Sequence, residues 1–153
     1  MVKCNCPEIR DEEWEMREHH WYGKTFYSKR VFMLFHTPIS IEDKIKEAMN
    51  DIRIRDYELT EPTMTLIKDA LFIGNVMIEV KNPDRTDPNI FEFQDVKLIS
   101  KVFNGPREKL RNGINELIKE IGTKPSAVYF WYVTCPICFE ERGYKTLIFA
   151  QLP

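Results

Sequence analysis

The chain has 153 residues, of which 43% are hydrophobic and 30% charged, a profile that argues for one globular domain and against a disordered or fibrous chain. Its 22 Lys and Arg residues are balanced by 24 Asp and Glu residues, so no excess of basic charge points to a nucleic-acid partner. No apolar run approaches the roughly 20 residues that cross a bilayer, and the acidic start lacks the apolar core of a signal peptide. We therefore expect neither membrane nor nucleic acid as a partner, and a cytoplasmic location.

An acidic N-terminal segment, residues 1–23, precedes the first regular elements. Within it, residues 15–23 are predicted to form a short helix that ends near Gly23 and exposes His19 and His20. The stretch 24–38 is rich in aromatic and β-branched residues and predicts a strand, whose last residues include a hydrogen-bonded structural histidine, His36.

The next elements are read from their periodicity. The segment 39–52 carries a helical stripe of apolar residues with Ser40 as its N-cap, and 63–80 reads as a hairpin that turns at Lys68-Asp69. A strand is then predicted over 91–103, a helix over 107–122 with Gly122 at its C-cap, and two strands over 126–133 and 144–152.

The order strand, helix, strand, strand thus occurs twice. A shift of about 69 positions places Leu34 on Phe103 and Ile52 on Ile121, and the helical stripes between them also coincide. The prediction is one domain, residues 1–153, made of two repeats over 24–81 and 90–153. Each repeat is too small to close its own core, so we expect an α+β fold of duplicated strand-helix-strand-strand modules. Its sheet is mostly antiparallel, its helices cover one face, and a cleft lies between the pseudo-twofold repeats.

The passage "SKVFNGPREKLRNGINELIKEIG", residues 100–122, resembles the strand-to-helix passage of the GyrI-like superfamily. The N-terminal cysteine pair, "EEW", "WYGKTFY" and "CPIC" together look like a stand-alone branch of that superfamily described as hydrolases. The resemblance implies small-molecule binding, as in the effector domains of drug-responsive regulators, a gyrase-inhibiting protein and hydrolases of strained rings. Members that bind cationic drugs carry a glutamate in the penultimate strand, where this chain has four aromatic residues, so a cationic ligand is not expected.

Those four aromatic residues are the first candidates for ligand binding. Side chains alternate along a strand, so Tyr129 and Trp131 share one face while Phe130 and Tyr132 share the other. One pair is expected to line the cleft and the other to enter the core, and alternation alone does not say which. Flat rings with a polar edge suit a planar aromatic ligand.

A carboxylate is the candidate for chemistry. Glu79 shares a strand face with Met77 and Asn75, and partial burial there would suit a general base or a ligand anchor. In the scheme that we expect for hydrolysis, Glu79 activates water while a tyrosine such as Tyr129 steadies the leaving group. The alternative is a solvated ion pair of Glu79 with Lys81 or Lys68.

The cysteines suggest a metal. Cys135 and Cys138 flank a Pro-Ile turn between two strands, the shape of a zinc knuckle, and Cys4 and Cys6 would complete a four-thiolate structural site. Free thiols and a redox or disulfide role remain alternatives.

Three functions follow. The leading one is a soluble protein that binds a small aromatic or hydrophobic molecule and sequesters or hydrolyses it. The others are a protein-interaction module that contacts a gyrase or a regulator through the acidic N-terminal segment, and a thiol- or metal-handling protein. The sequence does not decide whether the chain is an enzyme.

Overall fold

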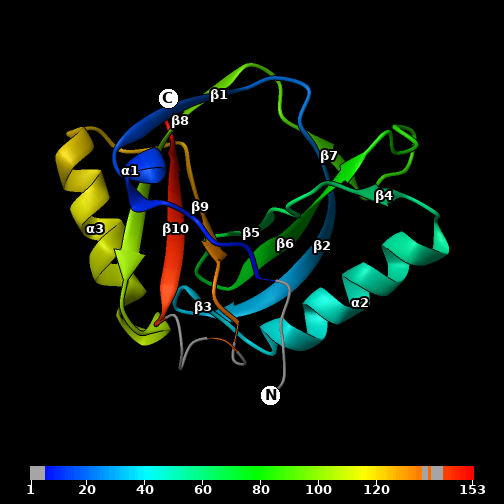
Figure 1. Ribbon diagram of the computed structural model, residues 1–153, viewed down its shortest axis with the longest axis horizontal. Coiled ribbons are helices and arrows are strands. Elements are labelled where there is room, and N and C mark those ends of the chain that lie inside the picture. Colours follow the sequence, from blue (N-terminus) through cyan, green and yellow to red (C-terminus); the bar gives the residue numbers. More distant parts are fainter. Residues whose placement is uncertain (1–5, 136–137, 139–142) are drawn as a thin grey trace. The chain divides into compact units, whose positions relative to one another are not determined.

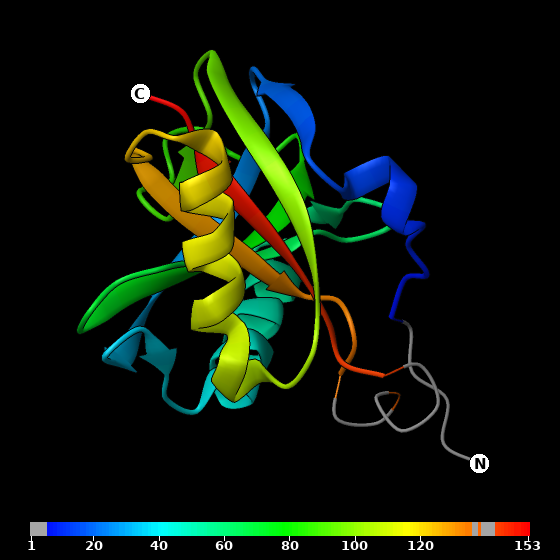
Figure 2. The ribbon, with the colours of Figure 1, turned by 90° about the vertical axis from the view of Figure 1, so that its left-hand side faces the viewer.

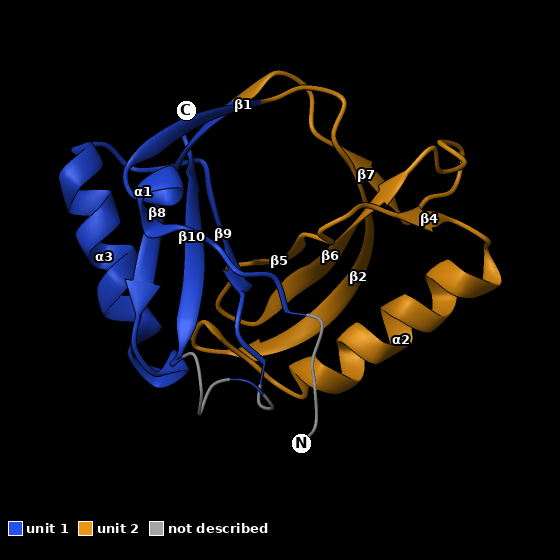
Figure 3. Ribbon diagram, in the orientation of Figure 1, with its two compact units in different colours: residues 1–20, 97–153 blue, residues 21–96 orange. Residues whose placement is uncertain are grey.

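The structure is a computed structural model that describes residues 6–135, 138 and 143–153 (Figure 1). The chain divides into two compact units, coloured separately in Figure 3. Unit 1 comprises residues 1–20 and 97–153, and unit 2 comprises residues 21–96.

Unit 2 is an antiparallel sheet with one helix. The strands pair in the order β5–β6–β2–β3, with β4 on β6 and β7 on β2. The elements are β2 (Thr25–Leu34), β3 (Thr37–Pro38), α2 (Ile41–Ile54), β4 (Glu58–Leu59), β5 (Thr65–Lys68), β6 (Ile73–Lys81) and β7 (Ile90–Glu92). The helix α2 buries Ile41, Ala48 and Ile52, which recur at the spacing of one helical face.

Unit 1 follows the same plan. Its strands run in the order β1–β8–β10–β9, and β10 pairs antiparallel with both of its neighbours. The elements are α1 (Asp11–Trp14), β1 (Arg17–Trp21), β8 (Val96–Asn104), the short 3-10 helix η1 (Arg107–Lys109), α3 (Leu110–Ile121), β9 (Ala127–Tyr132) and β10 (Lys145–Gln151). Figure 2 shows α3 lying along one face of these strands. The helix ends at Gly122, whose φ of 78° is left-handed and favours glycine, as the sequence predicts.

The two units share a pairing pattern as well as an element order. In unit 2 the second strand of the β5–β6 hairpin, β6, lies between β2 and β5. In unit 1 the last strand, β10, lies between β8 and β9 in the same way. The predicted α+β class, with strand-helix-strand-strand modules and mostly antiparallel pairing, is confirmed.

In unit 2 the helix identifies the faces of the sheet. Tyr27 and Lys29 both donate hydrogen bonds to Asp51 of α2, at 3.0 and 2.8 Å, so these side chains of β2 lie on the helix side. Facing residues of paired strands lie on the same side of a sheet. The opposite face therefore carries Phe26 and Ser28 of β2 with their partners Glu79 and Met77 of β6.

In unit 1 the helix α3 identifies the faces of the sheet. A Cβ placed on Gly113 would lie 2.6 Å from Phe103 and 3.2 Å from Ile148, so these two side chains pack directly beneath the helix. Ile148 faces Phe130 across the β10–β9 pair, and Phe149 faces Tyr129. Phe130 thus lies on the α3 side, and Tyr129 lies on the opposite face.

Four local predictions are wrong. The predicted strand 24–38 ends at Leu34, because Phe35 and His36, with φ of 46° and 70°, turn the chain and β3 pairs back on β2. Residues 17–21 form the strand β1 and the N-terminal helix is only Asp11–Trp14, because the segment gains a strand partner, β8, that no local pattern reveals. The predicted strand 91–103 is two strands, β7 and β8, separated at 93–95, where Asp95 has a φ of 50°. Ser40 has a φ of 55° and makes no side-chain cap, although its carbonyl accepts the amide of Lys44.

The helices α2 and α3 and the β5–β6 hairpin are confirmed. His36 is hydrogen-bonded as expected, since its Nδ1 lies 2.9 Å from Asp69 Oδ1. Within the described residues, no helix combines the length and the apolar character needed to cross a membrane.

Candidate functional site

The face of unit 1 opposite α3 carries a cluster of rings, here called the aromatic face. It contains Tyr129 and Trp131 of β9 and Phe149 of β10, with Trp14 and His19 from the N-terminal segment. Trp14 stacks on His19 at 5.3 Å between ring centroids, and both rings contact Phe149 edge-on at 5.9 and 5.8 Å. Edge-on and stacked contacts of this kind add to the stabilisation from burial alone.

Tyr129 is the polar member of this face. Only 3% of the residue is exposed, and burial raises its pKa to about 12. Its hydroxyl lies 3.4 Å from Gln151 Oε1. At neutral pH the phenol therefore keeps its proton and serves as a hydrogen-bond donor.

His19 and Ser100 meet on the same face, yet their geometry differs from that of a serine nucleophile and its base. His19 Nε2 lies 2.7 Å from Ser100 Oγ, and that hydroxyl donates its single proton to the carbonyl of Trp14 at 2.6 Å. The imidazole N–H must then be the donor to Ser100, whereas a general base would accept from it. Ser100 is fully buried, so the pair fastens the N-terminal segment to β8.

The other two aromatic residues of β9 lie beneath α3. Phe130 is buried, and its ring centroid is 5.3 Å from that of Tyr132. The guanidinium of Arg107 lies 3.8 Å from the centre of the Tyr132 ring, a cation–π contact at the start of the helix. The helix thus distinguishes the two pairs that alternation leaves equivalent, and Tyr129 and Trp131 are the pair away from it.

Asn75, Met77 and Glu79 lie together on the face of unit 2 opposite α2. Met77 is buried and faces Ser28, whose hydroxyl accepts a hydrogen bond of 3.2 Å from Asn75 Nδ2. The structure brings these three predicted residues to one face because they alternate along β6.

Glu79 is held on both carboxylate oxygens. Lys24 Nζ lies 2.6 Å from Oε2, and Thr60 Oγ1 donates to Oε1 at 3.1 Å. The side chains of Glu79 and Lys24 are 14% and 24% exposed, so the ion pair is half-buried rather than solvated. Lys81, which the sequence offers as a partner, instead lies 3.9 Å from Glu58. A carboxylate accepts about four hydrogen bonds, and Lys24 and Thr60 use two of these positions.

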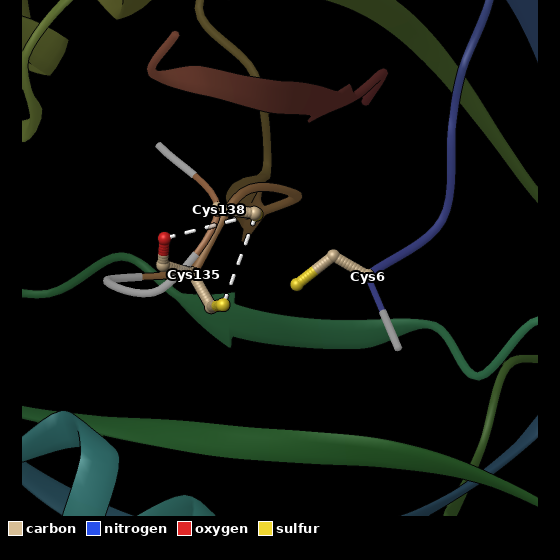
Figure 4. A group of neighbouring side chains, drawn as sticks. All are labelled: Cys6, Cys135 and Cys138. Carbon is tan, nitrogen blue, oxygen red and sulfur yellow. Dashed lines mark hydrogen bonds between the residues drawn. The ribbon is translucent and has the colours of Figure 1, made fainter. Parts of the chain in front are cut away.

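Three thiols form the second candidate site (Figure 4). The sulfur atoms of Cys6, Cys135 and Cys138 all lie within 4.8 Å of one another. Cys135 Sγ and Cys138 Sγ are 3.8 Å apart, far beyond the roughly 2.05 Å of a disulfide. Tetrahedral zinc with Zn–S bonds of about 2.3 Å places its sulfur ligands about 3.8 Å apart. These three cysteines can hold a metal ion; the fourth predicted ligand, Cys4, lies outside the described residues.

Hydrogen bonds at the base of the β9–β10 connection hold this cluster in place. The Lys145 amide donates to Thr134 Oγ1 at 2.9 Å, and Arg107 donates to the Thr134 carbonyl at 3.2 Å. Lys145 Nζ also lies 2.6 Å from Asp11 Oδ1, and this hydrogen bond lowers the pKa of Asp11. The N-terminal segment is thereby fixed beside the cysteine turn, where a hollow of about 300 Å³ is lined by Pro7, Glu8, Ile9, Val133, Thr134 and Lys145.

Sequence reasoning missed the partners of these residues. Lys24 and Thr60 are 55 and 19 positions from Glu79, and Ser100 is 81 positions from His19. No spacing rule connects residues so far apart. In β1, His19 is half-buried between exposed neighbours, but residues 17–20 are all polar, so the sequence of that segment shows no alternation.

A family model matches the sequence of this chain, and solved structures match its fold. The family described as bacterial hydrolase matches residues 1–151. Among solved structures, the crystal structure of the EcmrR C-terminal domain aligns with a TM-score of 0.71 at 14% identity, covering 92% of this chain and 96% of that one. The cryo-EM structure of an EcmrR–DNA complex aligns with a TM-score of 0.67 at 13% identity, covering 91% of this chain and 56% of that longer chain. No curated protein matches the sequence. The structural likeness concerns the fold.

Proposed function

Because this chain belongs to the bacterial hydrolase family, we propose that it binds a small, flat aromatic or hydrophobic molecule and hydrolyses or sequesters it, on a fold of the GyrI-like type. The observation that carries the proposal is the aromatic face of unit 1. Tyr129 and Trp131 lie there, away from the helix that covers Phe130 and Tyr132. Tyr129 and Trp131 are 3% and 6% exposed, so a planar ligand would have to enter between these rings, where it would gain stacking area and could replace Gln151 as the acceptor of the phenol proton.

Glu79 is the proposed catalytic or ligand-anchoring carboxylate. Lys24 and Thr60 fix its orientation and leave about two acceptor positions, which suits binding of a water molecule or of a ligand N–H or O–H group. As a general base, Glu79 would take a proton from that water as the water attacks the substrate. In a separate role within unit 1, Tyr129 would donate a hydrogen bond to a bound ligand, which would replace Gln151 as the acceptor of its hydroxyl. The two residues belong to different units, so each role is proposed and tested by itself.

Hydrolysis is tested with a panel of activated esters, lactones and strained-ring compounds. We expect Glu79→Gln, which keeps the shape and the Thr60 contact, to lower turnover by about 10²–10⁴-fold, the usual contribution of a general base. The matched control is Glu58→Gln, since Glu58 is an exposed glutamate of the same unit. Equal turnover by wild type and Glu79→Gln removes the catalytic assignment, and binding without turnover by wild type leaves sequestration.

Binding is tested by thermal shift with a library of flat aromatic compounds. A ligand at 100 times its Kd stabilises the native state by about 2.7 kcal/mol, which raises Tm by roughly 5–11 °C for a chain of this size. Trp131→Phe should abolish most of the shift, whereas Trp21→Phe, at an equally buried tryptophan of unit 2, should preserve it. Equal shifts in both variants would place the ligand away from the aromatic face.

We also propose that the thiol cluster holds a structural zinc ion, with Cys4 as its fourth ligand. The support is the sulfur separation of 3.8 Å, which matches the edge of a zinc–thiolate tetrahedron. Metal analysis of protein purified without a histidine tag should find about one zinc per chain. A ratio near zero, with all four thiols reactive toward a thiol reagent, would favour free cysteines.

A further inference from the structure

Unit 2 exposes a group of large apolar side chains, here called the tip surface. Its six residues are between 50% and 68% exposed, although each is a large hydrophobic side chain. They are Phe32, Leu34, Phe35, Leu71, Phe72 and Ile73. Single exposed apolar residues are ordinary, whereas a group of them at one place marks an interaction surface.

The contacts within the group show that it is one continuous surface. Phe32 of β2 faces Ile73 of β6, and both strands end here. The amide of Met33 donates to the Phe72 carbonyl at 2.7 Å, which draws the β5–β6 turn against β2. The rings of Phe35 and Phe72 lie 5.9 Å apart between centroids. Two segments that are separated by more than 30 positions therefore build a single apolar tip.

The tip surface is also held in shape and nearly free of charge. His36 Nδ1 and Asp69 Oδ1, at 2.9 Å, join the turn after β2 to the β5–β6 turn. These are the only charged or titratable side chains in residues 31–39 and 69–73, and the exposed Arg30 and Lys68 lie directly outside these segments. A surface that is already ordered and bears no excess of one charge loses little conformational entropy and suffers little repulsion on association.

The area of the tip surface indicates what kind of partner it can bind. The exposed parts of three phenylalanines and three aliphatic side chains amount to about 500–600 Å². A twofold interface brings the same surface of each copy together, so two copies bury about 1,000–1,200 Å², the lower bound of specific protein interfaces. We propose that the tip surface is the contact between two copies of this chain.

The chemistry of the tip favours a second copy over other partners. In a dimer of identical copies, the same side chains meet across the contact. Like charges at those positions would repel each other, and residues 31–39 and 69–73 carry no excess of one charge. The edge strand β3 has two residues and one of them is Pro38, so it offers little backbone for strand pairing and the contact is made by side chains. A lipid surface is the competing occupant for an apolar tip, and the experiment includes it.

Sedimentation velocity on the full chain from about 1 to 100 µM tests the proposal. We expect a monomer–dimer equilibrium in wild type. Phe72→Ser and Leu71→Ser should each raise the dissociation constant of the dimer at least tenfold, because removal of a central anchor commonly weakens an interface by that factor. Ile54→Ser is the matched control, since Ile54 is a 71% exposed aliphatic residue of α2 outside the tip surface. It should dimerise like wild type. Leu71→Ser provides the test if Phe72→Ser fails to fold by circular dichroism.

Three results would overturn the proposal. The first is a wild-type chain that stays monomeric over the whole concentration range. The second is a dimer that Leu71→Ser and Phe72→Ser leave as tight as the Ile54→Ser dimer, which would place the contact elsewhere. The third is a monomer that co-sediments with phosphatidylcholine–phosphatidylglycerol vesicles and loses this binding in the two tip variants, which would assign the tip to lipid.

Discussion

Replacing Cys138 by serine tests the metal centre where the structure is most specific. Cys138 is the buried member of the cluster, 6% exposed, and its sulfur lies 3.8 Å from that of Cys135. A metal at 1,000 times its Kd stabilises the native state by about 4.1 kcal/mol. If Cys138→Ser lowers the affinity for the metal a thousandfold, nearly all of this stabilisation is lost, and the Tm of the variant should be roughly 8–16 °C below that of wild type. Serine is close to cysteine in size, so the loss comes from the missing thiolate.

The measurement compares thermal melts with and without a chelator. We expect the chelator to lower the Tm of wild type to the value of Cys138→Ser and to leave the variant unchanged. The control is Thr134→Ser, a buried neighbour that keeps its hydroxyl and should respond to the chelator as wild type does. Tryptic cleavage at the exposed Arg10 should also quicken without the metal, since the cluster ties the N-terminal segment to unit 1. Identical chelator responses of wild type and Cys138→Ser would refute the metal centre.

Two further predictions concern the sheet and helix of unit 2. Gly74→Ala should lower the free energy of unfolding by about 1–3 kcal/mol, because the new Cβ would lie 2.4 Å from the Lys68 carbonyl and 2.5 Å from Met33 Sδ. A free energy of unfolding, measured in urea, that differs from wild type by less than about 0.3 kcal/mol would contradict this close packing. The hydrogen bond from Lys29 lowers the pKa of Asp51 below its usual 3.8. Its stabilisation is thus present above pH 4 and is lost as pH falls through the lowered pKa. Asp51→Asn should therefore cost about 2 kcal/mol at pH 7 and less at pH 2–3, and a difference independent of pH would argue against the ion pair.

The helices were predictable because their signal is local. The apolar stripe of α3 repeats every three or four residues, and Gly122 marks its end, so a short window contains the whole pattern. The strand β1 was not predictable in this way. Its partner β8 lies about 80 positions away, and the histidines that suggested a short surface helix belong to a strand whose middle residue, His19, bonds to Ser100. Pairing over such a distance leaves no periodic trace in the segment itself.

The candidate sites also contain some features that depend on neighbouring residues and others that depend on distant contacts. The Cys135–Cys138 turn and the alternation of residues 129–132 are visible in the sequence, since both depend on neighbours within four positions. The approach of Cys6 to that turn and the choice of Lys24 as the partner of Glu79 depend on contacts across the fold. Local patterns cannot specify those contacts.

By itself, the amino-acid sequence determined the α+β class, the repeated order of elements and the identities of the thiols and rings available for binding. Only the tertiary structure decided which of the two aromatic pairs lies beneath a helix, because alternation creates two faces and the docking of α3 distinguishes them. It also decided that apolar ends of β2 and β6 meet at one exposed tip. Hydrophobic periodicity shows which side chains share a face of a strand or helix. Whether that face is buried depends on which other elements pack against it, and those contacts come from the tertiary structure.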